Sequence, residues 1–258
     1  MAINKTSLLL LITLLSGCAA LTRLTLDEQY GRPDPERFAS PRAPAGSLSY
    51  RADVQPILER RCVVCHACYD APCQLKLGAW QGVARGASKE LVYDGSRLDE
   101  AQPTRLFTDA EKAPEWRQKG FFPVLNERDP SIPANLSGSL VFRALQLKQN
   151  HPLPPTAVLP PTFDFSLDRA QQCPRLEEYE RFADRNPLWG MPFGLPGLNP
   201  AEMATLITWL EQGAPFEGLP PLPPQLLQQV ADWERFLNGE SRKEKLVSRY
   251  IFEHLFLA

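Results

Sequence analysis

Two cysteines and a histidine stand within five consecutive residues, in the order Cys62-Val63-Val64-Cys65-His66. Because Cys62 and Cys65 are three residues apart, one helical turn directs both sulfurs to the same side. Two thiols on one side can form two thioether bonds to one flat ligand, and the imidazole that follows can bind a metal at its centre. The C-x-x-C-H pattern is typical of covalent c-type haem attachment. We therefore expect one haem c, bound through Cys62 and Cys65, with His66 as an axial iron ligand and the catalytic residue.

A short helix is expected directly before this motif. Pro56 is at a position that a first helical turn tolerates, and apolar residues follow at helical spacing. The apolar face of this helix consists of Val54, Ile57 and Leu58. After the motif, Trp80 and the run Leu91-Val92-Tyr93 are expected to belong to the core.

The remaining cysteines allow other interpretations. Cys68 and Cys73 extend the motif to C-x2-C-x2-C-x4-C, one residue longer than the bacterial ferredoxin spacing, and Pro72 precedes the last cysteine instead of following it. A zinc site is a further alternative. Haem is favoured because the chain has no second cysteine cluster. Cys68, Cys73 and Cys173 are left for disulfide bonding, and the sequence leaves open which two of them pair.

The second axial ligand is expected from a methionine loop. Residues 199–213 predict a helix in which Asn199 and Glu202 form a capping box and Gly213 provides the left-handed stop. The loop before it carries Met191-Pro192. A Met-Pro loop followed by a capped helix resembles the C-terminal half of a class I cytochrome c, in which a methionine thioether binds the iron. We predict Met191 as this ligand.

Three other residues compete with Met191. Met203 has the helical spacing of Leu206, Ile207 and Leu210, and so is expected in the core. His151, in a proline-rich loop, and His254, in a terminal helix, are the remaining alternatives.

The first residues have the pattern of an export signal. Residues 1–17 combine one lysine with an apolar run too short to cross a bilayer, which predicts a signal peptide. The run ends in Leu15-Ser16-Gly17-Cys18, which resembles the bacterial lipobox, so Cys18 is the predicted lipidation site; an ordinary signal peptide is the alternative. We expect a periplasmic protein anchored to the outer membrane through Cys18, with residues 18–47 as a tether.

The expected fold is mainly α. A class I cytochrome c-like haem domain is predicted over residues 48–215, with a long proline-rich insertion at about 99–188. Residues 216–258 are predicted as a linker and helices of a further region that continues beyond this chain, since the last helix reaches Ala258 while still apolar. With a net charge of −2 and no basic stripe, the chain is not expected to bind nucleic acid.

The segment Arg61 to Leu77, with its four cysteines, resembles the haem-binding segment of the bacterial fatty acid cis/trans isomerases, and residues 248–257 resemble a stretch that continues in that family. The resemblance is to the N-terminal third of these enzymes. It implies a periplasmic haem enzyme that converts cis to trans double bonds in the acyl chains of membrane phospholipids. It also implies that no nicotinamide cofactor is used.

Rotation about a double bond requires its π bond to be broken. An oxidised haem iron could withdraw electron density and so weaken that bond, while the protein orients the chain and excludes water. An iron bound by both His66 and Met191 has no open position, so either Met191 leaves or the electron moves without a direct bond. The competing hypothesis is a lipid-anchored electron-transfer cytochrome c, which would use the same ligands and the same anchor.

Overall fold

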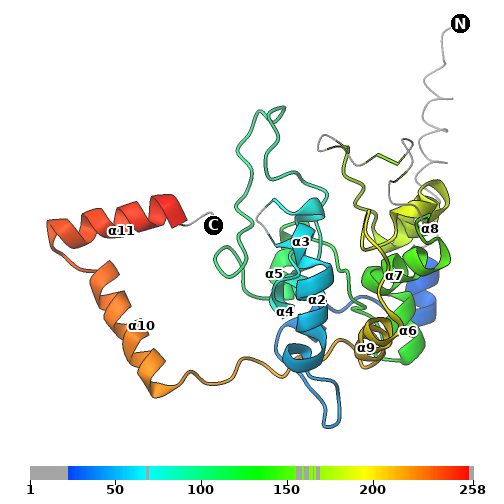
Figure 1. Ribbon diagram of the computed structural model, residues 1–258, viewed down its shortest axis with the longest axis horizontal. Helices are drawn as coiled ribbons and strands as arrows, with labels where there is room; N and C mark the ends of the chain where they lie inside the picture. Colours follow the sequence, from blue (N-terminus) through cyan, green and yellow to red (C-terminus); the bar gives the residue numbers. More distant parts are fainter. Residues whose placement is uncertain are drawn as a thin grey trace, which may run out of the picture. The chain divides into compact units, whose positions relative to one another are not determined.

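The structure is a computed structural model that describes residues 23–67, 70–154, 159, 163, 164, 166 and 169–255. The predicted signal peptide, Cys18 and Cys68 lie outside the described residues. The chain divides into two units, Met1–Glu217 and Gly218–Ala258 (Figure 1). The described residues form helices and no strands, which confirms the prediction of a mainly α protein.

The first unit is built from short helices joined by long loops. Its labelled α-helices are α2 (Gln55–Arg61), α3 (Val63–His66), α4 (Trp80–Arg85), α5 (Ala113–Gln118), α6 (Ile132–Ser137), α7 (Leu140–Asn150), α8 (Tyr179–Arg185) and α9 (Pro200–Glu211). Residues 23–30 are also helical. Single turns occur at Pro35–Phe38, Tyr50–Val54, Pro72–Gln74, Leu176–Glu178 and Pro187–Trp189. Helix α6 packs against α7 and α9, and α4 packs against α5 (Figure 1).

Side-chain caps fix where the longer helices begin. In α9 the Glu202 backbone N–H donates to Asn199 Oδ1 at 2.9 Å, and the Asn199 N–H donates to Glu202 Oε2 at 3.2 Å. Gly213 follows the helix with φ +84°, a conformation that glycine adopts without steric cost. The predicted capping box and stop are confirmed. In α7 the Ser139 hydroxyl accepts from the Phe142 N–H at 3.2 Å.

Aromatic side chains from distant segments form the centre of the core. Trp209 packs against Tyr50 with ring centroids 5.8 Å apart, and Trp80 stacks on Phe216 at 4.8 Å. The Trp209 Nε1–H donates to the Pro215 carbonyl at 2.9 Å, so this buried indole is satisfied. Burying these rings therefore ties the turn Tyr50–Val54, α4 and α9 to the loop that follows α9.

Two expectations about the core have opposite outcomes. Val54, Ile57 and Leu58 are buried, as their spacing predicts, and so is Trp80. The run 91–93 was wrongly predicted as core: the side chain of Leu91 is 40% exposed and that of Tyr93 68%. A short apolar run between turns carries no periodicity that could separate a buried strand from an exposed loop.

The segment predicted as an insertion, about 99–188, contributes to the same core. Phe122, Leu125, Leu140 and Tyr179 are buried in it, while Trp116 is buried in a separate small cluster with Ala110 and Phe121. Phe122 exchanges backbone hydrogen bonds with Ala87, at 2.8 and 3.0 Å. The segment is thus an integral part of the first unit, because its apolar residues pack inward.

Residues 18–47 were predicted to form a tether, and their described part differs from that prediction. Phe38 is buried, with its ring centroid 6.1 Å from that of Trp80. The Asp34 N–H donates to the Glu127 carbonyl at 2.7 Å, and Arg37 Nη2 donates to Asn135 Oδ1 at 2.7 Å. Because burying the Phe38 side chain is favourable, this segment packs against the first unit and does not extend freely from it.

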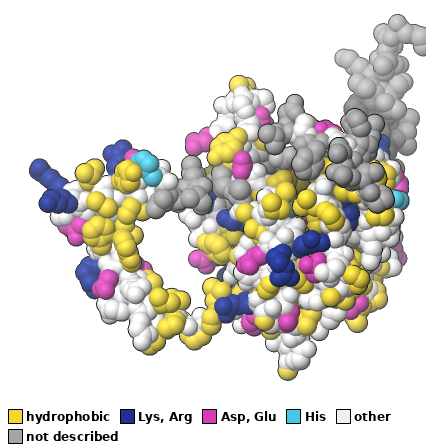
Figure 2. Space-filling view, viewed as in Figure 1, with side chains coloured by type: hydrophobic (Ala, Val, Ile, Leu, Met, Phe, Trp, Pro, Cys, Tyr) yellow, Lys and Arg dark blue, Asp and Glu magenta, His cyan; other side chains and the backbone are white. Residues whose placement is uncertain are grey.

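The second unit contains α10 (Pro224–Leu237) and α11 (Arg242–Leu255). The Glu244 N–H donates to the Ser241 hydroxyl at 3.2 Å and the Ser241 N–H to Glu244 Oε2 at 3.0 Å, so a capping box begins α11. In the described part of this unit no residue is buried. Hydrophobic side chains are visible along it in Figure 2. The exposed large hydrophobic residues of this unit include Leu226, Leu227, Val230, Trp233, Leu246, Val247, Tyr250 and Phe252.

Exposed hydrophobic side chains do not by themselves make a helix long and apolar enough to cross a membrane. Of the helices that the structure describes, none combines enough length with enough hydropathy to span a bilayer.

Candidate functional site

The structure gathers Cys62, Cys65 and His66 where α2 meets α3. The backbone N–H groups of Cys65 and His66 both donate to the Cys62 carbonyl, at 3.1 and 3.0 Å. Cys62 itself lies between the two helices, with φ −125°, and therefore not within one continuous turn. Both cysteines are free thiols; Cys62 is half-buried and Cys65 is exposed. Two free sulfurs therefore flank one tight turn that ends at the histidine.

The ring of His66 is buried, with 8% of the residue exposed. Its Nδ1 lies 2.9 Å from the carbonyl oxygen of Leu75. Since a carbonyl only accepts, Nδ1 must carry the proton, which leaves the lone pair on Nε2 free for a metal. Burial lowers the pKa of His66, and the bond to Leu75 opposes this shift only in part. The imidazole is therefore neutral near pH 7, the form that binds iron.

An unusual loop supplies the Leu75 carbonyl. Cys73 and Gln74 both have positive φ, +56° and +50°, although neither is glycine. The Gln74 side chain is buried, donating from Nε2 to the Glu90 carbonyl at 2.9 Å and accepting from the Thr104 hydroxyl at 2.7 Å. Buried Arg85 donates to the Gln74 carbonyl. These bonds hold a strained backbone in place. Sequence reasoning missed Gln74 and Arg85, since no glycine marks the turn.

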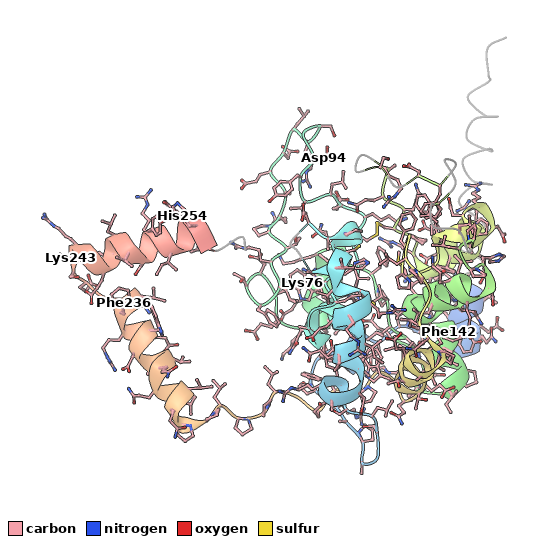
Figure 3. All side chains as sticks on the ribbon, viewed as in Figure 1. Lys76, Asp94, Phe142, Phe236, Lys243 and His254 are labelled. Atoms are coloured by element: carbon pink, nitrogen blue, oxygen red, sulfur yellow. A yellow bond between two sulfur atoms is a disulfide. The ribbon has the colours of Figure 1, made fainter. Side chains whose placement is uncertain are left out.

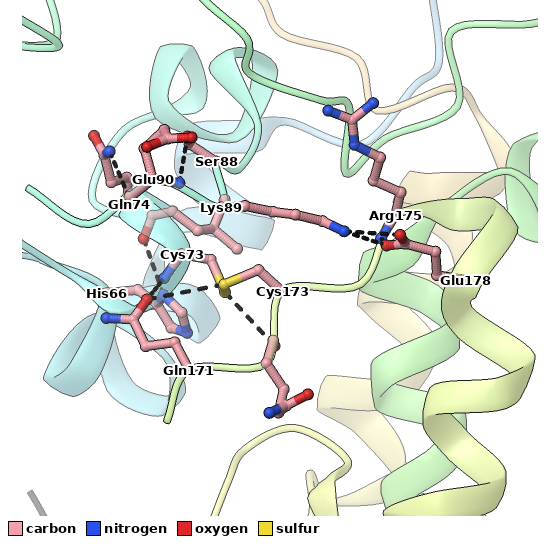
Figure 4. Close-up of a disulfide and its surroundings, with 12 residues drawn as sticks. His66, Cys73, Gln74, Ser88, Lys89, Glu90, Gln171, Cys173, Arg175 and Glu178 are labelled. Carbon is pink, nitrogen blue, oxygen red and sulfur yellow. Dashed lines mark hydrogen bonds and ion pairs between the residues drawn. A yellow bond between two sulfur atoms is a disulfide. The ribbon is translucent and has the colours of Figure 1, made fainter. Parts of the chain in front are cut away.

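A disulfide joins this loop to a distant segment. Cys73 is bonded to Cys173, with their Cα atoms 5.6 Å apart (Figure 4). This selects one of the pairings that the sequence left open. It also removes Cys73 as a thiolate ligand, which weakens the iron–sulfur interpretation. Among the described residues, no three His, Cys, Asp or Glu side chains come together as a metal site.

The two remaining thiols differ in their surroundings. Burial raises the pKa of Cys62 to about 11, and Arg61 lowers it only in part. Cys62 therefore keeps its proton at neutral pH while no metal or haem is bound. A thioether bond places no charge on this buried sulfur. Two free thiols, together with a neutral histidine that is hydrogen-bonded to the Leu75 carbonyl, fit a covalently attached haem c.

Met191 lies in a different part of the first unit. Its backbone N–H donates to the Ala144 carbonyl in α7 at 2.9 Å, and its residue is 37% exposed. Met191 and Met203 both line a cavity of about 40 Å³. Arg61 connects this region to the cysteine motif, because its Nη2 donates to the Gly197 carbonyl at 2.6 Å. The backbone hydrogen bond of Met191 goes to Ala144 in α7, whereas His66 is hydrogen-bonded to Cys62, Leu75 and Leu77.

Substitution of each methionine tests which one binds iron. Met191→Ala should remove the weak thioether-to-iron band near the red edge of the ferric spectrum. Met203 is buried, so Met203→Leu should leave the band and cost less than about 1.5 kcal/mol, as a swap of similar volume does. Absorption spectra of the two purified variants decide the matter. Loss of the band in Met203→Leu alone would refute the assignment to the loop.

Lys148 is a further residue that sequence reasoning missed. It lines the same small cavity as Met191 and is only 3% exposed. Its Nζ is buried without a hydrogen-bond partner in the described part of the chain. Burial lowers its pKa. Burial without a partner disfavours the charged form of this side chain. The available signal was its spacing, eight residues after buried Leu140 on α7.

The two alternative histidines are placed on the surface. His151 is exposed at the end of α7. His254 is exposed on α11 (Figure 3), and its Nδ1 lies 2.8 Å from the Tyr250 carbonyl. Their exposure does not distinguish them from ordinary surface histidines.

Comparison with known protein families assigns the chain to one family. The family model for fatty acid cis/trans isomerase matches residues 101–258. The chain belongs to this family. Fatty acid cis/trans isomerases are enzymes, and their substrates are unsaturated fatty acyl chains. The matched part includes Met191 and Cys173 and begins after the cysteine motif. No curated protein and no solved structure matches the chain.

Proposed function

We propose that this isomerase holds a haem c through Cys62, Cys65 and His66, and that it converts cis to trans double bonds in phospholipid acyl chains. The observation that supports this most strongly is the buried His66 ring. Its Nδ1 is hydrogen-bonded to the Leu75 carbonyl at 2.9 Å, which leaves the Nε2 lone pair available, and two free thiols precede it in the same motif. Histidines that bind a metal through one ring nitrogen usually donate the N–H of the other ring nitrogen to a carbonyl or a carboxylate.

The protein residues would position the reaction. The two cysteines would fix the cofactor covalently, and the Leu75 carbonyl would fix the tautomer and plane of His66. When bound, the haem supplies an iron that can withdraw electron density from a double bond, so that the bond can rotate. Gln74 and Arg85 would keep the carbonyl in place, since the buried Gln74 side chain donates to the Glu90 carbonyl and buried Arg85 donates to the Gln74 carbonyl.

Location forms part of the same proposal. An exported chain would meet the oxidising conditions under which the Cys73–Cys173 disulfide is stable. Lipidation at Cys18 would anchor it to the outer membrane and raise its concentration near phospholipids without any new contact. An acyl chain buried in a bilayer would otherwise meet a free haem domain rarely.

Fatty-acid composition tests the function directly. Cells that express the protein should show a raised trans/cis ratio in the methyl esters of phospholipid fatty acids, measured by gas chromatography. Replacing His66 with Ala, or both haem cysteines with Ala, should abolish the rise. His151→Gln, at an exposed histidine, should leave it unchanged. An unchanged ratio from haem-loaded protein would instead favour the electron-transfer cytochrome.

A further inference from the structure

A cavity of about 350 Å³ in the first unit has an excess of positive charge. Its volume lies at the lower end of the range for small-molecule sites, about 300 to 1,000 Å³. The charged side chains in its wall are Arg23, Arg117, Arg128, Arg175, Glu127 and Glu177. Four arginines and two glutamates leave an excess of two positive charges, whereas the whole chain has a net charge of −2. Such a cavity favours an anion.

Two of the arginines are already used by the protein. Arg117 donates from Nε and Nη2 to Glu127, at 2.5 to 3.1 Å, and also to the carbonyls of Arg85 and Ala84. Arg128 is paired with Asp27. These pairs neutralise the buried Glu127 carboxylate and keep the wall rigid. They leave the binding of a ligand to the other cationic side chains.

Arg23 and Arg175 are the two cations that remain available, and Arg175 is the one held against an aromatic ring of the wall. Its guanidinium lies 5.6 Å from the centroid of the Phe122 ring, and the residue is exposed. The nearby carboxylate of Glu178 is bound by Lys89, at 2.6 and 2.8 Å, and not by the Arg175 side chain (Figure 4). A guanidinium stacked on an aromatic face keeps its N–H groups at the edge, where they can bind two oxygens of one anion.

The cavity is joined to the haem-binding segment. Arg175 stands two residues after Cys173, which is bonded to Cys73. On the other side of the same loop, the Ser88 N–H donates to the Cys73 carbonyl at 2.8 Å. Its neighbour Ala87 pairs with Phe122 in the cavity wall. The disulfide and the backbone hydrogen bonds of Ala87 and Ser88 therefore connect the cavity wall to the loop that orients His66.

We propose that this cavity binds the phosphodiester group of a phospholipid, with Arg175 as its principal contact, so that the acyl chain is held for isomerisation. This inference rests on the proposed function. With Arg117 paired to Glu127 and Arg128 to Asp27, Arg23 and Arg175 exceed Glu177 by one positive charge, which suits the single negative charge of a phosphodiester. The planar guanidinium of Arg175 matches the geometry of its oxygens. Apolar side chains complete the wall next to the headgroup: Phe121, Phe122, Leu125 and Leu176. The limited volume admits a headgroup and leaves the acyl chains outside.

Calorimetric titration of the haem-loaded protein with dihexanoylphosphatidylglycerol, a short-chain lipid used as monomers, tests the site. We expect saturable binding that Arg175→Gln weakens about tenfold, the effect of losing one charge-assisted contact. Arg181→Gln removes an exposed arginine of α8 outside the cavity and should bind as the wild type does. Inorganic phosphate should compete with the lipid, and sodium hexanoate should not.

Each result bears on the proposal. Equal affinity of Arg175→Gln and wild type, with unchanged circular dichroism, would overturn it. Competition by hexanoate as strong as by phosphate would overturn the phosphodiester assignment. If the wild type raises the trans/cis ratio but does not bind the lipid, this inference fails and the proposed function stands. If the lipid binds through Arg175 and no isomerisation occurs, the proposed function fails and the headgroup site stands.

Discussion

Replacing Cys62 and Cys65 together with Ala should abolish covalent haem. The wild-type protein should retain a peroxidase stain after denaturing electrophoresis, because thioether bonds survive unfolding. The double variant should lose the stain completely, and each single variant should keep a weaker one through the remaining bond. His66→Ala should keep the stain but change the spectrum of the folded protein, since the role proposed for this residue is to bind the iron and not the porphyrin edge.

The chain offers a matched control for this experiment. Cys173→Ser also removes a cysteine, but one that is bonded to Cys73 and lies outside the motif. It should retain the stain at the same intensity per molecule. A stain that persists in the Cys62→Ala/Cys65→Ala protein would show that the haem is attached elsewhere, and the site assignment would then be wrong.

The local elements of this chain could be predicted from its sequence because their signals are local. The capping boxes at Asn199 and Ser241 and the buried face of α2 are confirmed. Met203 was correctly placed in the core, because its neighbours at helical spacing are apolar. Each of these features depends on residues within two helical turns of one another.

The features that the sequence did not reveal depend on distant partners. Gln74 orients Leu75 only because Arg85 and Thr104 reach it from elsewhere in the fold. Nothing adjacent to Cys73 indicates a bond to a residue 100 positions away. The packed segment around Phe38 was predicted as a tether for the same reason: its partners, Trp80 and Asn135 among them, follow much later in the chain.

The disulfide should stabilise the first unit more than any other single bond does. Cys73→Ser, Cys173→Ser and the double variant should each lower the free energy of unfolding by about 4.7 kcal/mol, the chain-entropy value for a loop of this length. The bond spans 100 residues, so its loss greatly enlarges the unfolded ensemble. Urea unfolding followed by circular dichroism gives these values.

Three equal losses are the signature of one shared bond, since the second substitution removes nothing that the first had left. Reduction with dithiothreitol should lower the stability of the wild type by the same amount and leave the double variant unchanged. Cys68→Ser should have no such effect, because Cys68 is not in this bond. Loss of stability in Cys68→Ser together with only one of the other two variants would contradict the pairing. The absorption spectrum of the bound haem should change in the same variants that lose stability. Cys73 lies two residues before Leu75, whose carbonyl holds the His66 imidazole.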